Sequence, residues 1–251
     1  MRLAFDFAGP VGVGRPVAFV HGFTQTGRSW LPVAERLRDV ESTLIDAPGH
    51  GSSGDIVADL RTGADMIAST MRRGDLVGYS MGARFALHTA LQHPEQVSTL
   101  VLVSGTPGIE NDTERAARRA ADEALADRIE SMALVDFLEE WLANPMFSGL
   151  TEATRNIADR MRNFPGGLAS SLRHAGTGTQ EPLWDRLHEL RCPVLVVCGA
   201  ADTKFRGIGE RMHSMIPGST FIVVEEAGHT VHLEQTDRFV GTLLDWFSTH
   251  H

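Results

Sequence analysis

The sequence predicts an α/β protein built on a mainly parallel, doubly wound sheet with an inserted helical cap. Two observations predict this fold class. Short apolar runs alternate with helical segments along most of the chain, which is the pattern of βαβ units in a parallel sheet. Residues 110–190, in contrast, contain no such run but carry helical periodicity. The 251 residues, 42% hydrophobic and 22% charged, suit one large domain with an insertion.

Most predicted strands are continuously apolar, as expected for a sheet whose two faces are both covered. The first strand instead alternates between apolar and polar residues. In chain order the strands are expected at 1–7, 16–20, 42–45, 75–77, 100–103, 193–197 and 221–224. Helices are expected at 31–38, at 56–71, from 83 onward and at 237–247. These connections place helices on both faces of the sheet.

The helical insertion divides the sheet domain into two segments. We expect the core to comprise residues 1–108 and 191–251, and the cap to comprise residues 109–190. Within the cap, apolar side chains recur at i, i+3, i+4, i+7 and i+8, which marks one face of an amphipathic helix. These residues are Leu134, Phe137, Leu138, Trp141 and Leu142.

The net charge of −9 makes sequence-independent binding to nucleic acid unlikely, because the whole chain repels phosphate. An anionic substrate would need a local cluster of basic residues. The chain has neither a signal-like apolar run at its start nor 18 consecutive apolar residues, so we expect a cytoplasmic protein without membrane insertion. Cys192 and Cys198 lie too far apart along one strand for a disulfide and are expected to be reduced. No residues have metal-ligand spacing, no cofactor is expected, and monomer and dimer both remain open.

The sequence Gly78-Tyr79-Ser80-Met81-Gly82 lies between an apolar strand and a helix. This G-x-S-x-G pattern is typical of a nucleophile elbow, in which a sharp turn exposes the serine hydroxyl above the sheet. The glycines allow the strand and the helix to approach closely. Taken alone, the same pattern could be a glycine-flanked turn with an incidental serine.

Two later loops supply the partners that a nucleophilic serine needs. Asp202 follows the strand at 193–197, and His229 follows the last strand. Each alone could be an ordinary loop residue, but the order Ser80, Asp202, His229 is that of a catalytic triad at the carboxyl ends of strands. Backbone N–H groups of Phe23 and Met81 are the expected oxyanion hole. His21 is expected to brace its loop by hydrogen bonding.

With these motifs in place, the chain resembles α/β-hydrolases throughout. Within them it resembles the 2-succinyl-6-hydroxy-2,4-cyclohexadiene-1-carboxylate synthases, the pyruvate-eliminating enzymes of menaquinone biosynthesis. The more selective parts of the match are Arg84, the arginine-bearing helix at 115–122, the Gly-Thr-Gly-x-Gln segment at 176–180 and Asp-x-Lys-Phe at 202–205. The other matching positions are 21–23, 46–51, 78–83, 105–108, 141 and 228–229. Ala83 departs from the family, which usually has glycine there, and no loss of function is expected.

The resemblance implies that Ser80, activated by His229, acts as a base that removes a ring proton and expels pyruvate without an acyl-enzyme. It also implies a small polycarboxylate substrate that several cations bind. The matching substrate-binding positions are Tyr79, Arg84, Arg118, Trp141, Arg160 and Lys204.

Some of these positions also have purely structural explanations. Arg118 has ion-pair spacing to Glu114 and Asp122 on a solvated helix face. Trp141 could pack in the cap core, and Lys204 could be a solvated loop charge. Arg84 and Arg118 are expected to contribute no more than about 1 kcal/mol each to stability.

Two other functions use the same motifs. A carboxylesterase or a carbon–carbon bond hydrolase would use Ser80 as a true nucleophile. A non-catalytic relative would keep the fold and the pocket without turnover. The complete triad argues against a non-catalytic relative, and the arginines argue against an apolar ester as substrate.

Overall fold

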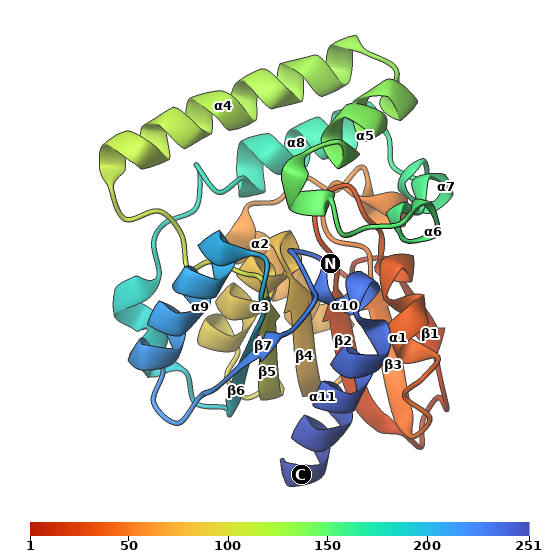
Figure 1. Cartoon of the computed structure of the whole chain (residues 1–251), viewed down its shortest axis with the longest axis vertical. Helices are drawn as coiled ribbons and strands as arrows, with labels where there is room; N and C mark the ends of the chain where they lie inside the picture. The colour runs from red at the N-terminus through yellow and green to blue at the C-terminus, as the bar shows by residue number, and fades with distance from the viewer. Residues whose placement is uncertain (251) are drawn as a thin grey trace.

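The computed structural model describes residues 1–250, and its seven strands form one sheet (Figure 1). The strand order is β1-β3-β2-β4-β5-β6-β7. All neighbours are parallel except β1, which runs antiparallel to β3 at the edge. The strands are β1 Phe5–Ala8, β2 Arg15–Val20, β3 Val40–Ile45, β4 Gly74–Tyr79, β5 Val97–Val103, β6 Val194–Gly199 and β7 Thr220–Val224. The predicted mainly parallel sheet is confirmed.

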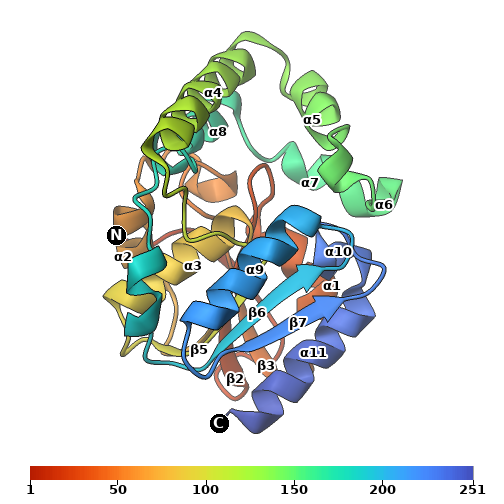
Figure 2. The same ribbon diagram turned by 60° about the vertical axis from the view of Figure 1, so that its left-hand side comes forward.

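Helices cover both faces of the sheet because successive strand residues point in opposite directions. Val17 and Phe19 of β2 belong to one buried cluster, and Ala18 and Val20 belong to the other. One face packs against α1 Leu31–Ala34 and α11 Thr236–Thr249, with α10 Val231–Glu234 at the upper end of that face. The other face packs against α2 Leu60–Thr70, α3 Met81–Gln92 and α9 Thr203–Met215 (Figures 1 and 2).

A helical cap lies over the carboxyl ends of the strands (Figures 1 and 2). Its helices are α4 Asp112–Ser131, α5 Leu134–Leu142, α6 Glu152–Arg155, α7 Ile157–Arg160 and α8 Pro165–Ala175. The helical character predicted for this part of the chain is confirmed, including α5 with its apolar stripe. The domain limits at 109 and 190 stay a prediction.

The cap has a core of its own, in which α4 packs along α8. Ala126 and Ile129 of α4 are buried with Leu168 and Leu172 of α8. At the surface, one arginine of α8 joins the two helices. Arg173 donates to the carboxylates of Glu123, Asp127 and Glu130 on α4 at 2.6–3.0 Å.

Several predicted boundaries were wrong, and the backbone hydrogen bonds give the reason. The helix predicted at 31–38 ends at Ala34, because the N–H groups of Arg36 and Leu37 bond three residues back instead of four. The helix predicted at 56–71 begins at Leu60, because the Asp59 side chain accepts from the Thr62 N–H and caps it there. The first strand is confined to Phe5–Ala8.

Both cysteines are free thiols, as predicted. Cys198 is buried in β6, and Cys192 is half-buried just before it. No helix within residues 1–250 has the length and apolar character needed to cross a membrane.

Candidate active site

Ser80 stands at the sharp turn between β4 and α3. Its backbone has φ 52° and ψ −107°, a positive-φ conformation that is strained for a residue with a side chain. A Cβ at Gly78 would collide with the Gly82 carbonyl, and a Cβ at Gly82 would collide with the carbonyl of Val20 on β2. Both glycines are therefore needed for the helix to start this close to the sheet, which is the geometry of a nucleophile elbow.

The structure brings Ser80, His229 and Asp202 together from three separate loops. The Ser80 Oγ lies 3.1 Å from His229 Nε2, and His229 Nδ1 lies 2.6 Å from Asp202 Oδ2. Because a carboxylate only accepts, the Nδ1–H donates to Asp202, which leaves Nε2 free to accept the serine proton. Asp202 is held in turn by the Phe205 N–H at the start of α9.

A second carboxylate, which no motif in the sequence indicates, holds the histidine loop. Glu234 Oε2 accepts from the Gly228 N–H at 2.7 Å, and Oε1 accepts from the Thr230 N–H at 2.9 Å. These two N–H groups flank His229 on either side. The Tyr79 hydroxyl lies 3.1 Å from Thr230 Oγ1 and so links the serine turn to the same loop.

The predicted oxyanion donors lie on the two loops beside Ser80. Met81 opens α3, so its N–H has no partner in the preceding turn, and Phe23 lies in the loop after β2. Within residues 1–250 neither N–H donates a hydrogen bond to the protein. Free donors on both sides of the serine agree with an oxyanion hole.

His21 holds the loop that carries Phe23. The Ala47 N–H donates to His21 Nε2 at 3.0 Å, so the opposite nitrogen carries the proton and donates to the Gly22 carbonyl at 2.8 Å. Burial lowers the pKa of His21 to about 4, which keeps the ring neutral. This bonding agrees with the predicted bracing role.

Above the serine, a cavity of about 340 Å³ separates the sheet from the cap. Of the eleven predicted catalytic, oxyanion and substrate-binding residues, all except Asp202 line it. Four of them carry positive charge: Arg84, Arg118, Arg160 and Lys204. Asp122 is the single carboxylate among the described lining residues, so the cavity is cationic in a chain of net charge −9.

Arg84 and Arg118 differ more than the sequence suggested. The Arg84 side chain is buried, and its Nη1 donates to the Ala175 carbonyl of α8 at 2.6 Å. Burial, with a smaller effect of the Arg118 charge, lowers the pKa of Arg84 to about 10, so it stays charged at neutral pH. Arg118 is 41% exposed and pairs with Asp122 at 2.7 Å. Because the helix places Arg84 beneath the cap, we expect its loss to cost more stability than the sequence suggested.

The other predicted contacts come from three elements. Trp141 of α5 packs edge-on against Phe23 at 5.3 Å, so it joins cap packing to the cavity wall. Its indole N–H has no acceptor within residues 1–250. Arg160 of α7 is 3% exposed, and Lys204 of α9 is exposed at the cavity edge above Phe205.

Sequence reasoning missed several lining residues, among them Gln25, Asn144, Met146, Phe147 and Phe205. Phe205 lies in the Asp-x-Lys-Phe segment that carries the family resemblance, whereas no spacing or motif identifies the other four. Asp122 was seen only as an ion-pair partner, yet it also accepts from the Gly178 N–H at 3.0 Å. The Gly-Thr-Gly-x-Gln segment was the available signal for that contact. Within residues 1–250 no cluster of three or more His, Cys, Asp or Glu side chains could hold a metal ion.

Comparison with protein families matches residues 17–242 to the "Alpha/beta hydrolase family". A Salmonella newport protein named 2-succinyl-6-hydroxy-2,4-cyclohexadiene-1-carboxylate synthase is 32% identical over 90% of this chain and 91% of its own. A Bacillus subtilis protein that carries the same name provisionally is 38% identical, and the match covers 99% of this chain and 95% of the relative.

Among solved structures, MenH from S. aureus aligns with a TM-score of 0.89 at 29% identity, over 100% of this chain and 99% of its own. A malate-bound esterase from Thermogutta terrifontis aligns with a TM-score of 0.83 at 27% identity, and the alignment covers 99% of this chain and 94% of the esterase.

Proposed function

The chain belongs to the alpha/beta hydrolase family, and we propose that it is a lyase of menaquinone biosynthesis. Its substrate would be 2-succinyl-5-enolpyruvyl-6-hydroxy-3-cyclohexene-1-carboxylate, from which it eliminates pyruvate. The product would be 2-succinyl-6-hydroxy-2,4-cyclohexadiene-1-carboxylate. The observation that carries the proposal is the group of four cations around one serine–histidine pair. The names of the relatives agree with it.

In this reaction Ser80 acts as a base. His229 Nε2 accepts the hydroxyl proton while Ser80 Oγ removes a proton from the ring. The electron pair of that C–H bond forms a ring double bond, and the C–O bond to the enolpyruvyl group breaks. The departing enolate takes up a proton and leaves as pyruvate, so no water and no redox partner is consumed. Asp202 stabilises the imidazolium that forms.

Charge develops on a substrate oxygen as the ring proton leaves. The free N–H groups of Phe23 and Met81 stabilise it, because donors fixed in advance need no reorganisation. The three substrate carboxylates are bound by Arg84, Arg118 and Arg160, with Lys204 at the edge of the cavity. Guanidinium groups suit this task because they bind carboxylates through two parallel hydrogen bonds.

A carboxylesterase or carbon–carbon bond hydrolase is the second candidate. The strained Ser80 and its bonded histidine would equally serve acyl transfer, and an esterase is among the similar structures. In that case Ser80 would form an acyl-enzyme, and water would be consumed.

The test compares pyruvate release from the pathway intermediate with hydrolysis of aryl esters, in wild type and Ser80→Ala. We expect fast pyruvate release, weak ester hydrolysis, and loss of both in the variant. A fluorophosphonate probe should label wild type but not Ser80→Ala. Ester turnover far above pyruvate release would favour the second candidate.

A further inference from the structure

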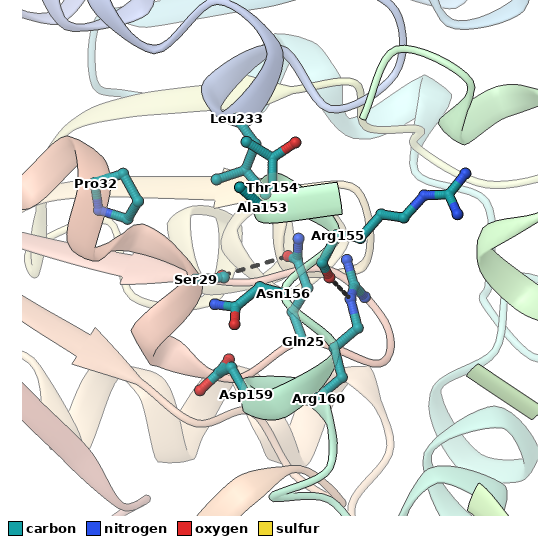
Figure 3. Close-up of a pocket in the computed structure, with 10 residues that line it drawn as sticks. All are labelled: Gln25, Ser29, Pro32, Ala153, Thr154, Arg155, Asn156, Asp159, Arg160 and Leu233. Atoms are coloured by element: carbon teal, nitrogen blue, oxygen red, sulfur yellow. Dashed lines mark hydrogen bonds between the residues drawn. The ribbon is translucent and has the colours of Figure 1, made fainter. Parts of the chain in front are cut away.

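A second chamber of about 260 Å³ lies beside the catalytic cavity (Figure 3). Its walls come from residues 25–32 and Leu233 of α10 on the sheet side, and from α6 and α7 of the cap. Gln25 and Arg160 line both spaces, so these two side chains form the boundary between them. Ala153 and Asn156 are exposed, and the chamber reaches solvent on their side.

Arg160 is a buried cation whose charge is unmatched. Its Nε donates to the Arg155 carbonyl at 2.8 Å, as Figure 3 shows, and its Nη1 donates to Thr24 Oγ1. Both acceptors are neutral. Burial lowers the pKa of Arg160 to about 10, so the guanidinium is still charged at neutral pH. Within residues 1–250 it has no ion-pair partner and its Nη2 donates to no protein group.

Asp159, which also lines the chamber, attracts the guanidinium through its charge but forms no ion pair with it. The Thr26 hydroxyl donates to Asp159 at 2.8 Å, and Nε atoms of Arg28 and Arg162 lie 3.9 Å away. Burying a charge without a partner costs several kcal/mol, so such a site is suited to an anionic ligand.

We propose that this second chamber is a binding site for a short carboxylate, held by Arg160 from the side opposite the catalytic cavity. Resting on the proposed function, the ligand is the pyruvate that leaves the ring. Because one guanidinium borders both spaces, the pyruvate carboxylate can stay on Arg160 while the molecule passes from the cavity to the chamber. It then leaves past Ala153, whereas the ring product stays under α4 and α5.

The experiment titrates sodium pyruvate into wild type and four variants, with heat of binding as the readout. Ala153→Glu adds a repelling charge at the chamber, and Ala153→Trp fills it. Ala158→Glu and Ala158→Trp are matched controls, since Ala158 is exposed on α7 and does not line the chamber. None of these positions belongs to the catalytic site.

We expect Ala153→Glu to weaken pyruvate binding about 5-fold, from a Coulomb repulsion of about 1 kcal/mol. Ala153→Trp should abolish binding, and both Ala158 variants should match wild type. Saturating pyruvate should also leave fluorophosphonate labelling of Ser80 unchanged. Equal binding in the Ala153 and Ala158 variants, no binding to wild type, or protection of Ser80 by pyruvate would each overturn the proposal.

Acetate and neutral acetone, titrated in the same way, test the carboxylate requirement without turnover. Acetate should bind and acetone should not. The two proposals can therefore fail separately: a protein that binds short carboxylates at the chamber but releases no pyruvate from the pathway intermediate would refute the lyase function alone.

Discussion

His229 is positioned by two carboxylates with different tasks. Asp202 bonds to the imidazole ring itself, whereas Glu234 bonds to the backbone on both sides of it. Glu234 lies five residues beyond His229 and belongs to α10, so the short helix carries the group that fixes the loop in front of it. Glu234 is thus a positioning residue rather than a catalytic one.

Replacing Glu234 should therefore slow the chemical step. Glu234→Ala removes two hydrogen bonds to a charged acceptor, and a shift of His229 by about 1 Å would cost roughly 100-fold in kcat. KM should hardly change, because Glu234 does not line the cavity. Glu234→Gln keeps one acceptor and should recover part of the rate.

Steady-state kinetics of the Glu234 variants check this expectation, with Glu225→Gln as a control on an exposed glutamate of the same loop. If KM rises while kcat stays at the wild-type value, Glu234 does not position the histidine.

Arg84 and Arg118 allow binding and folding to be separated. Losing either guanidinium should lower kcat/KM for the pathway intermediate roughly 10- to 150-fold, the loss of about 1.5–3 kcal/mol. Arg84→Ala should also lower stability by about 1–3 kcal/mol, because the Ala175 carbonyl loses its donor. Arg118→Ala should change stability by less than about 1 kcal/mol, since Arg118 is 41% exposed and the buried Asp122 carboxylate keeps the Gly178 N–H as a donor.

The measurements are pyruvate release, neutral-ester hydrolysis and melting temperature for both variants. Arg118→Ala should hydrolyse a neutral ester as well as wild type does, and Arg118→Lys should restore part of the pyruvate release. Equal losses on both substrates would mean that Arg118 shapes the cap instead of binding a carboxylate.

These residues show which parts of the site a sequence can predict. Ser80, Asp202 and His229 each follow a recognisable strand, so their meeting point follows from the topology of a parallel sheet. The burial of Arg84 depends on a carbonyl 91 residues away, and no local pattern records such a contact. The role of Glu234 was missed for a different reason, because a carboxylate that bonds to backbone has no sequence signature.

At the scale of elements, the contact between the segment 176–180 and α4 explains why the segment contains two glycines. A Cβ at Gly178 would collide with the backbone of Arg119, and a Cβ at Gly176 would come close to the Asp122 carboxylate. The chain lies against the helix at a distance that only glycine permits. This contact places Asp122, and through it Arg118, at the edge of the cavity.

Gly178→Ala should therefore displace α4 and impair substrate binding. We expect a loss of about 1–3 kcal/mol in stability from overpacking, and a higher KM with a smaller change in kcat. Gly207→Ala is the matched control, because that glycine lies exposed in α9 with no atom near its added Cβ. It should stabilise the protein by about 0.5–1 kcal/mol.

Melting curves and kinetics of the two glycine variants decide this point. An unchanged KM in Gly178→Ala would show that the helix accommodates the methyl group and that the segment does not position Arg118.

The elements differ in how well the sequence indicated them. Buried parallel strands are continuous apolar runs and were predicted near their true positions. The helices α6 and α7 have four residues each, too few to show a periodicity, and they were predicted only as part of a helical region. They nevertheless carry Arg160 and the wall of the second chamber.

At the scale of the whole molecule, four buried histidines make stability depend on pH. Burial lowers the pKa of His21 and His88 to about 4 and of His50 and His232 to about 3. In the unfolded chain each has a pKa of about 6.5. The folded protein therefore binds fewer protons below that pH, so stability is complete above about pH 6.5 and falls as the pH decreases toward 3.

The best single test is His232, which is buried, lies stacked on Trp30 at 4.2 Å and has no hydrogen-bond partner within residues 1–250. Each such histidine contributes a slope of up to about 1.4 kcal/mol per pH unit. His232→Phe keeps a flat ring against Trp30 but removes one titration. Between about pH 5.5 and 4.5 its free energy of unfolding should therefore fall less steeply than that of wild type, by up to about 1.4 kcal/mol per pH unit.

Urea unfolding at a series of pH values measures the slope, and His188→Gln, on an exposed histidine, should retain the wild-type value. Identical slopes for wild type and His232→Phe would mean that the buried ring is already protonated in the folded protein, or that the site opens to water before the chain unfolds.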